Sequence, residues 1–103
     1  MVDAPKFSQV ITGNATSGTF TPKGLFYASA YKAPGSTTFS ATVSIEKSMN
    51  DGVTWLIVPR NENNDPATYN AAFSFLIEET NVGMLYRFVV TSFAGNPIVV
   101  EFR

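Results

Sequence analysis

The sequence contains no cysteine and no histidine among its 103 residues. The first absence excludes a disulfide framework and a thiolate metal site. The second removes the usual general base near neutral pH, the commonest zinc ligand and every Ser-His or Cys-His nucleophile arrangement. We therefore expect a protein that is not an enzyme and that has no catalytic residue, no metal ion and no cofactor.

Charged residues are scarce, since seven Lys and Arg and eight Asp and Glu make up 15% of the chain and leave a formal net charge of −1. The charges are scattered singly, so no basic stripe follows a phosphate backbone and no nucleic-acid partner is expected. Ser, Thr and Asn fill the polar positions instead. A polar but weakly charged surface favours permanent docking against another protein.

Long apolar runs and helix signals are missing as well. No run approaches the roughly 20 apolar residues that span a bilayer, so no membrane partner is expected. Residues 1–6 lack the apolar core of a signal peptide, which indicates synthesis in the cytoplasm. No window keeps apolar residues at a helical spacing between plausible caps, so no helix is predicted.

Strand patterns recur along the whole chain and are separated by turn residues such as Asn50-Asp51-Gly52. The predicted strands cover residues 8–12, 18–20, 25–30, 39–47, 54–58, 72–78, 85–92 and 98–102. A chain of this length forms one domain. The pattern predicts an all-β fold, namely an antiparallel β-sandwich of seven or eight short strands, Ig-like or jelly-roll-like, with a small β-barrel as the alternative.

Residues 1–24 carry few apolar anchors and many Ser, Thr, Gly and Asn residues. We therefore expect a loosely packed amino-terminal arm there, ahead of a sandwich over residues 25–103. Apolar residues that alternate along the later strands predict the core, which Trp55 would close. They are Phe73, Phe75, Ile77, Tyr86, Phe88, Val90, Ile98, Val100 and Phe102. A buried Trp needs a backbone carbonyl or a hydroxyl near its indole N–H.

Residues 39–59 form the most informative segment, because an alternating strand, a tight turn and a returning apolar strand follow one another. Residues 48–55 approximate the Asp-box, a Ser-x-Asp-x-Gly-x-Thr-Trp hairpin found in sialidase-type propellers and other β proteins. The chain is too short for a propeller. We interpret the segment as a structural turn, because Asn and Asp in turns usually bond to the backbone. The turn residues are Ser48, Asn50, Asp51, Gly52, Thr54 and Trp55.

The order of these motifs is similar to that of a family of small tailed-phage virion proteins. In that family a Glu-Arg-Ser-x-Asp-Gly-Gly-x-Thr-Trp segment precedes a Tyr-Arg strand and a final strand. Here Lys47 replaces the Arg, and Tyr86-Arg87 supplies the second motif. The resemblance implies a capsid decoration or cement protein on the phage head, present in multiple copies or as a homo-oligomer, with the major capsid protein as partner. A neck, tail or head-fibre component is the alternative within the same class.

Two pairs of charged residues need separate interpretation. Glu46 and Arg87 lie on predicted strands and could form an ion pair across the sheet. Alternatively, Arg87 could face a neighbouring subunit. Glu78 and Glu79 are adjacent, so they point to opposite faces of a strand and are not predicted to form the acid pair of a hydrolase.

Four aromatic residues lie outside the clearest core pattern: Tyr27, Tyr31, Tyr69 and Phe93. If exposed, they would suit either a protein interface or the stacking of a sugar ring. The protein interface agrees with the resemblance to virion proteins. The alternative function, a carbohydrate- or receptor-binding module, predicts that Tyr31, Tyr69 or Trp55 is exposed.

Overall fold

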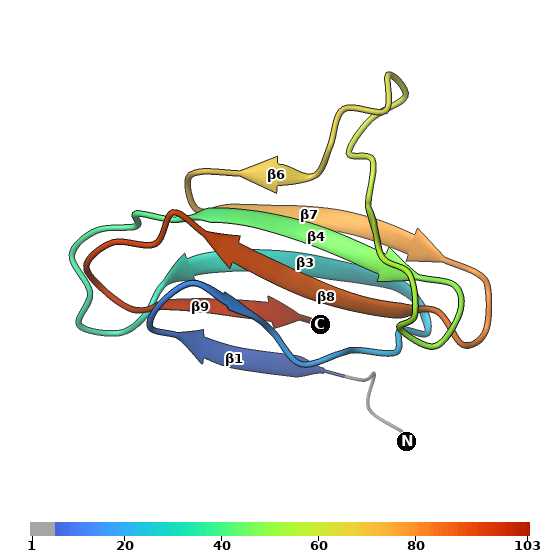
Figure 1. The fold of residues 1–103 in the computed structure, drawn as a ribbon, viewed down its shortest axis with the longest axis horizontal. Coiled ribbons are helices and arrows are strands. Elements are labelled where there is room, and N and C mark those ends of the chain that lie inside the picture. Colours follow the sequence, from blue (N-terminus) through green and yellow to red (C-terminus); the bar gives the residue numbers. More distant parts are fainter. Residues whose placement is uncertain (1–5) are drawn as a thin grey trace.

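Two antiparallel sheets face each other in the computed structural model, which describes residues 6–103 (Figure 1). The four-stranded sheet has the order β1 (Phe7–Ile11), β9 (Ile98–Phe102), β3 (Gly24–Lys32) and β7 (Phe73–Glu79). The five-stranded sheet has the order β2 (Ala15–Thr16), β8 (Leu85–Thr91), β4 (Thr42–Ser48) and β5 (Leu56–Ile57), with β6 (Thr68–Tyr69) also paired to β4. The predicted single-domain β-sandwich is therefore confirmed. Residues 6–103 contain no helix, and hence none that could cross a membrane.

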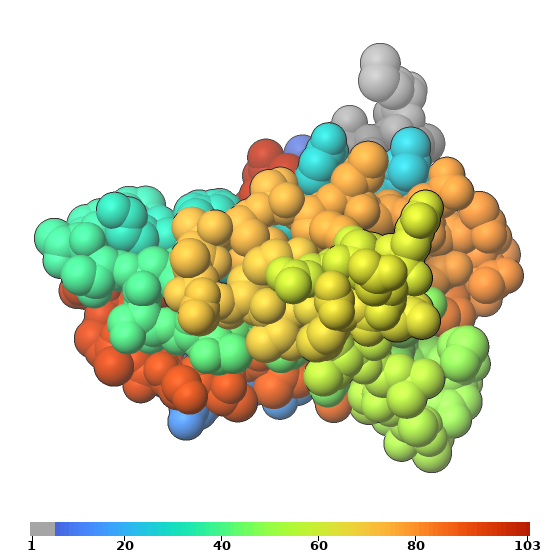
Figure 2. Space-filling view, turned by 90° about the horizontal axis from the view of Figure 1, so that it is seen from above, coloured from blue at the N-terminus to red at the C-terminus, as the bar shows by residue number. Residues whose placement is uncertain are grey.

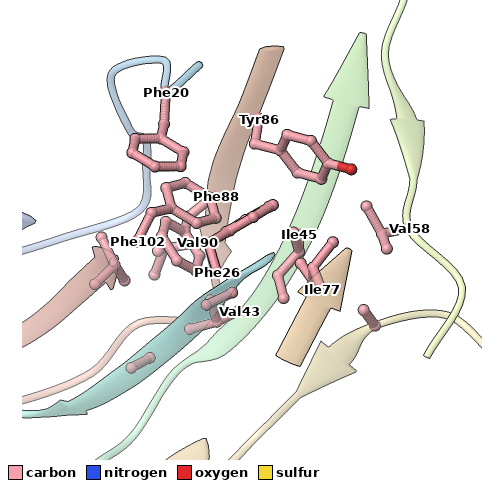
Figure 3. Packing of buried hydrophobic residues seen from close by; sticks show 14 of the residues in the cluster. Phe20, Phe26, Val43, Ile45, Val58, Ile77, Tyr86, Phe88, Val90 and Phe102 are labelled. Carbon is pink, nitrogen blue, oxygen red and sulfur yellow. The ribbon is translucent and has the colours of Figure 1, made fainter. Parts of the chain in front are cut away.

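The core lies between the two sheets and is rich in aromatic rings (Figure 3). Phe102 of β9 stacks on Phe88 of β8, with 4.2 Å between ring centroids. It also stacks on Phe20, at 5.0 Å. Such pairs stabilise a core by about 0.5–1.5 kcal/mol each beyond the burial of their area. Phe102 therefore joins the two sheets and the segment that follows β2.

The core prediction is confirmed for β8 and β9, where every predicted residue is buried. Phe73 and Phe75 share a face with Ile77 but are only partly buried. They lie on β7, which is at the edge of its sheet and has a neighbouring strand on one side alone. The prediction was wrong for Trp55, which is outside the core cluster and packs on a hairpin instead.

Several strand bounds differ from the predicted ones. β4 begins at Thr42 rather than residue 39, and β5 is only the pair Leu56–Ile57. Residues 18–20 contribute a single bridge between Phe20 and Tyr86. The two-residue strands β2 and β6 were not predicted, because two residues are too few to show an alternating pattern.

The expected loose arm is wrong for residues 6–24. β1 pairs with β9 over its full length, and Ile11 and Phe20 are buried in the core. The chain then crosses to the other sheet, where the Ser17 hydroxyl accepts a hydrogen bond of 2.8 Å from the N–H of Phe88. Main-chain pairing and two large side chains hold a segment that is otherwise poor in apolar residues. Residues 1–5 of the predicted arm lie outside the described residues.

Candidate functional site

The β4–β5 hairpin, which we define as residues 48–57, stands at one end of the sandwich beside the turn between β7 and β8 (Figure 1, right). Ser48 at the end of β4 is paired with Leu85 at the start of β8, so the two connections share this end. In Figure 2 the hairpin forms the light-green corner of the molecule. It contains the whole segment that the sequence identifies as a structural turn.

Two side chains hold the hairpin in its shape. The buried Ser48 hydroxyl accepts hydrogen bonds from the N–H groups of Asn50 (3.3 Å) and Gly52 (2.8 Å). It donates to Asn50 Oδ1 at 2.9 Å, and the same oxygen accepts the N–H of Thr54 at 2.9 Å. The turn needs this support because Asp51 and Gly52 have φ angles of 58° and 86°, in the left-handed region.

Trp55 packs beneath this turn. Its indole N–H donates to the backbone oxygen of Gly52 at 3.0 Å, the kind of partner that the sequence predicts for it. The guanidinium carbon of Arg87 lies 4.0 Å from the centroid of the indole ring. Such a cation–π contact stabilises by about 0.5–2 kcal/mol, depending on its exposure to water.

Arg87 also forms an ion pair with Glu46, its partner in register on β4. The Nε and Nη2 atoms of Arg87 each lie 2.8 Å from Glu46 Oε1. Both side chains are partly buried, at 25% and 18% exposure, so the pair is shielded from water more than a surface pair is. Of the two roles considered for Arg87, the structure contains the intramolecular pair. The guanidinium group is thereby fixed between a carboxylate and an indole ring.

The hairpin presents apolar side chains to solvent. Val53 and Met49 expose 81% and 67% of their surface, and Leu56 and Ile57 are about half exposed. A shallow hollow of about 150 Å³ lies beside Met49 and Leu56, and its other lining residues are Lys47, Asn50 and Thr54. Apolar groups that a rigid turn already orders lose little conformational freedom when they bind a partner. The arrangement therefore suits contact with another protein.

These apolar residues were not predicted as a contact surface from the sequence. Part of the signal was present, because residues 54–58 are apolar on both faces of the returning strand. A strand with one buried face should alternate with a period of two. A continuous apolar run next to a tight turn therefore predicts a second apolar face outside the core.

The four aromatic residues considered for an interface fall into two groups. Tyr27 and Tyr31 are exposed on the outer face of the four-stranded sheet, both on β3. Tyr69 and Phe93 pack against the core, and Tyr69 stacks on Phe73 with 4.0 Å between ring centroids. Tyr69 and Phe93 are only partly exposed, and their ring surfaces extend the core at its margin.

Glu101 lies on the same outer face as Tyr31 and is buried. Its Oε2 accepts a hydrogen bond of 2.9 Å from the Tyr31 hydroxyl, and its Oε1 lies 3.3 Å from Arg103 Nε. The hydrogen bond to this carboxylate raises the pKa of Tyr31 above its ordinary value. The hydroxyl of Tyr31 is thus already engaged, which leaves the ring as the part of the side chain available for contact.

Within residues 6–103, no three acidic side chains are close enough together to hold a metal ion. Comparison of the chain with protein-family models, with curated proteins and with solved structures found no match in any of the three. The fold and the β4–β5 hairpin are therefore the features from which a function can be inferred.

Proposed function

We propose that this protein is a non-enzymatic structural protein of a phage virion, which binds the outer surface of the capsid as a cement or decoration protein. The observation that carries the proposal is the β4–β5 hairpin. It exposes Met49 and Val53 on a turn held by the side chains of Ser48 and Asn50. A preordered apolar projection of this kind loses little conformational freedom on binding, which suits it to a protein interface.

The residues that carry the resemblance to virion proteins also support the proposal. Glu46, Trp55 and Arg87 come from separate parts of that motif, and Arg87 joins them into one unit by contacting both of the others. The unit stabilises the base of the hairpin and leaves its tip exposed. The shared motif would then preserve the shape of the hairpin, while the residues at its tip would adapt to a particular partner.

A cement role follows from mass action. A capsid that holds DNA under pressure is weakest where neighbouring capsomers meet. A small domain that bridges two capsomers adds buried area to the assembled state and therefore shifts the equilibrium towards it. Because many copies bind, a modest contact per copy is enough.

The carbohydrate-binding alternative has less support. The indole ring of Trp55 has Arg87 against it, and the ring of Tyr69 is stacked on Phe73. Stacking of a sugar needs an open aromatic face. Of the aromatic residues considered, this leaves Tyr27 and Tyr31, which lie on a sheet face.

The test is the copy number of the protein in purified virions, measured by quantitative mass spectrometry against the major capsid protein. A ratio near that of the capsid subunit supports a lattice-wide cement role. A ratio that is a small fraction of it supports the neck, tail or fibre alternative. Absence of the protein from virions overturns the proposal.

A further inference from the structure

The outer edge of β7 is a regular strand edge without a neighbour in the described part of the chain. β7 pairs with β3 through an unbroken register of seven residue pairs. No backbone hydrogen bond from residues 6–103 reaches its other side. The strand contains no proline and no lysine, and the register shows no bulge. Its charged residues, Glu78 and the buried Glu79, stand at one end, so residues 73–77 lack the proline, charge and bulge that usually protect a sheet edge from pairing.

The hydrogen bonds of β3 show which groups of β7 point to this edge. The N–H of Tyr27 donates to the backbone oxygen of Arg103 at 2.7 Å, and the N–H of Arg103 donates to that of Tyr27 at 3.0 Å. Residues next to Tyr27 in β3 therefore bond towards β7, because bonding direction alternates along an antiparallel strand. Their partners in β7 are the odd-numbered residues. The N–H and C=O groups of Ser74, Leu76 and Glu78 consequently point away from the sheet.

A groove of about 220 Å³ lies beside this edge, lined by Lys47, Val58, Pro59, Phe75, Leu76, Ile77, Glu78 and Tyr86. Residues 75–78 of β7 form one side. Val58 and Pro59, at the base of the connection from β5 to β6, belong to the other. Figure 2 looks onto this edge and shows the connection in yellow beside β7 in orange. The edge thus combines main-chain donors and acceptors with a pocket for side chains.

We propose that β7 binds an extended segment of a partner protein, which becomes an antiparallel fifth strand of the four-stranded sheet. Residues of that segment opposite Ser74, Leu76 and Glu78 would exchange backbone hydrogen bonds with them, and the residues between would place aliphatic side chains in the groove. Recognition would depend on an extended backbone and on aliphatic residues at every second position. The inference is independent of the virion role, since any partner with such a segment satisfies it.

The edge fits a single strand better than the edge of a second sandwich. The connection between β5 and β6 projects beyond β7 on the same side (Figure 1, top). It is a hairpin closed by the bridge between Pro59 and Pro66 and by a hydrogen bond of 2.8 Å from the N–H of Arg60 to the backbone oxygen of Asp65. A second sheet approaching β7 would meet this projection, whereas a single extended chain needs only the groove beside the edge.

The experiment is a titration of the ¹⁵N-labelled protein with a synthetic peptide of alternating Thr and Val, capped at both ends by Lys. The amide signals of Ser74, Leu76 and Glu78 should shift. A peptide N-methylated at its Thr residues should not bind, because those N–H groups face β7 when Val enters the groove. A peptide N-methylated at its Val residues should still bind, since those groups face away.

Leu76→Pro tests the same edge from the protein side. It removes an N–H that the pairing with β3 does not use, so a proline can be tolerated there. Peptide binding should weaken about tenfold or more, because lost hydrogen bonds are the main source of affinity. Leu76→Lys, which adds an edge charge at a side chain that is 49% exposed, serves if the proline variant does not fold. Val10→Lys, on the opposite edge strand β1, is the matched control and should bind normally.

Three results would overturn the inference. The first is the absence of shifts in β7 at millimolar peptide. The second is equal binding by the two N-methylated peptides, which would indicate contact through side chains alone. The third is a concentration-dependent shift of the same amides without peptide, which would show that a second copy of the chain occupies the edge.

Discussion

Removal of the Ser48 hydroxyl should loosen the β4–β5 hairpin while the apolar core stays intact. This hydroxyl is buried and makes three hydrogen bonds, two from backbone N–H groups and one to the side chain of Asn50. Ser48→Ala removes the partner of all three groups at once. Water can replace the hydroxyl as a hydrogen-bond partner for the groups near the exposed tip. We therefore expect the free energy of unfolding to fall by about 1–3 kcal/mol, which is less than the cost of three buried groups left without any partner.

The change is measured by thermal and urea unfolding. For a domain of this size the midpoint temperature should drop by roughly 4–8 °C for each kcal/mol. Trp55 gives a local readout, because it is the only Trp and its indole N–H bonds to Gly52 within the same turn. Its emission should shift to longer wavelength when the turn loosens.

Ser29→Ala is the control, since the Ser29 hydroxyl donates a 3.1 Å hydrogen bond to that of Ser74 on an exposed face. It should change stability by less than about 0.5 kcal/mol, the usual range for a surface substitution. An equally small effect of Ser48→Ala would refute the view that these hydrogen bonds hold the hairpin. A loss above about 4 kcal/mol would mean that the hydroxyl supports the sandwich as a whole.

Three further outcomes are expected. Val53→Asp should weaken binding to virions about tenfold or more in co-sedimentation, as expected for an interface anchor. The control Val10→Asp should leave binding unchanged. Equal effects of the two substitutions would contradict the role of the hairpin as the binding surface. Burial and the hydrogen bond to Glu79 raise the pKa of Tyr86. The contribution of Tyr86 to the free energy of unfolding should therefore stay constant below about pH 10, the pKa of an unfolded Tyr, and decline above it. Tyr86→Phe should reduce that decline, as measured by urea unfolding at high pH. If the free energy of unfolding of the variant fell with pH as steeply as before, Tyr86 would not be its cause. Deletion of residues 1–20 should abolish cooperative unfolding, because β1 and Phe20 are lost with them.

The regular strands could be predicted because their residues alternate. In β8 the inner residues Tyr86, Phe88 and Val90 are buried, and their neighbours along the strand are more exposed. The turn at residues 50–52 could be predicted for a similarly local reason, since Asn, Asp and Gly are the residues that tolerate left-handed angles. Both signals depend only on neighbours in the sequence.

The remaining features depend on contacts between distant residues. Ile11 and Phe20 lie in a stretch of low apolar content, and they are buried because β1 pairs with β9 and because Phe20 stacks on Phe102. Trp55 lies outside the core and contacts Arg87, which is more than thirty positions further along the chain. No local pattern encodes either contact.

The place of β9 has a consequence for how the protein is made. β9 lies between β1 and β3, and all five of its residues are buried, yet among the nine strands of residues 6–103 it is the last to leave the ribosome. During synthesis β1 therefore has no partner strand while the strands between β1 and β9 in the sequence are produced. The four-stranded sheet can close only after residue 102 has emerged, so cotranslational folding should stop at a partly built intermediate. A stalled or truncated nascent chain would expose that intermediate to aggregation and to proteases.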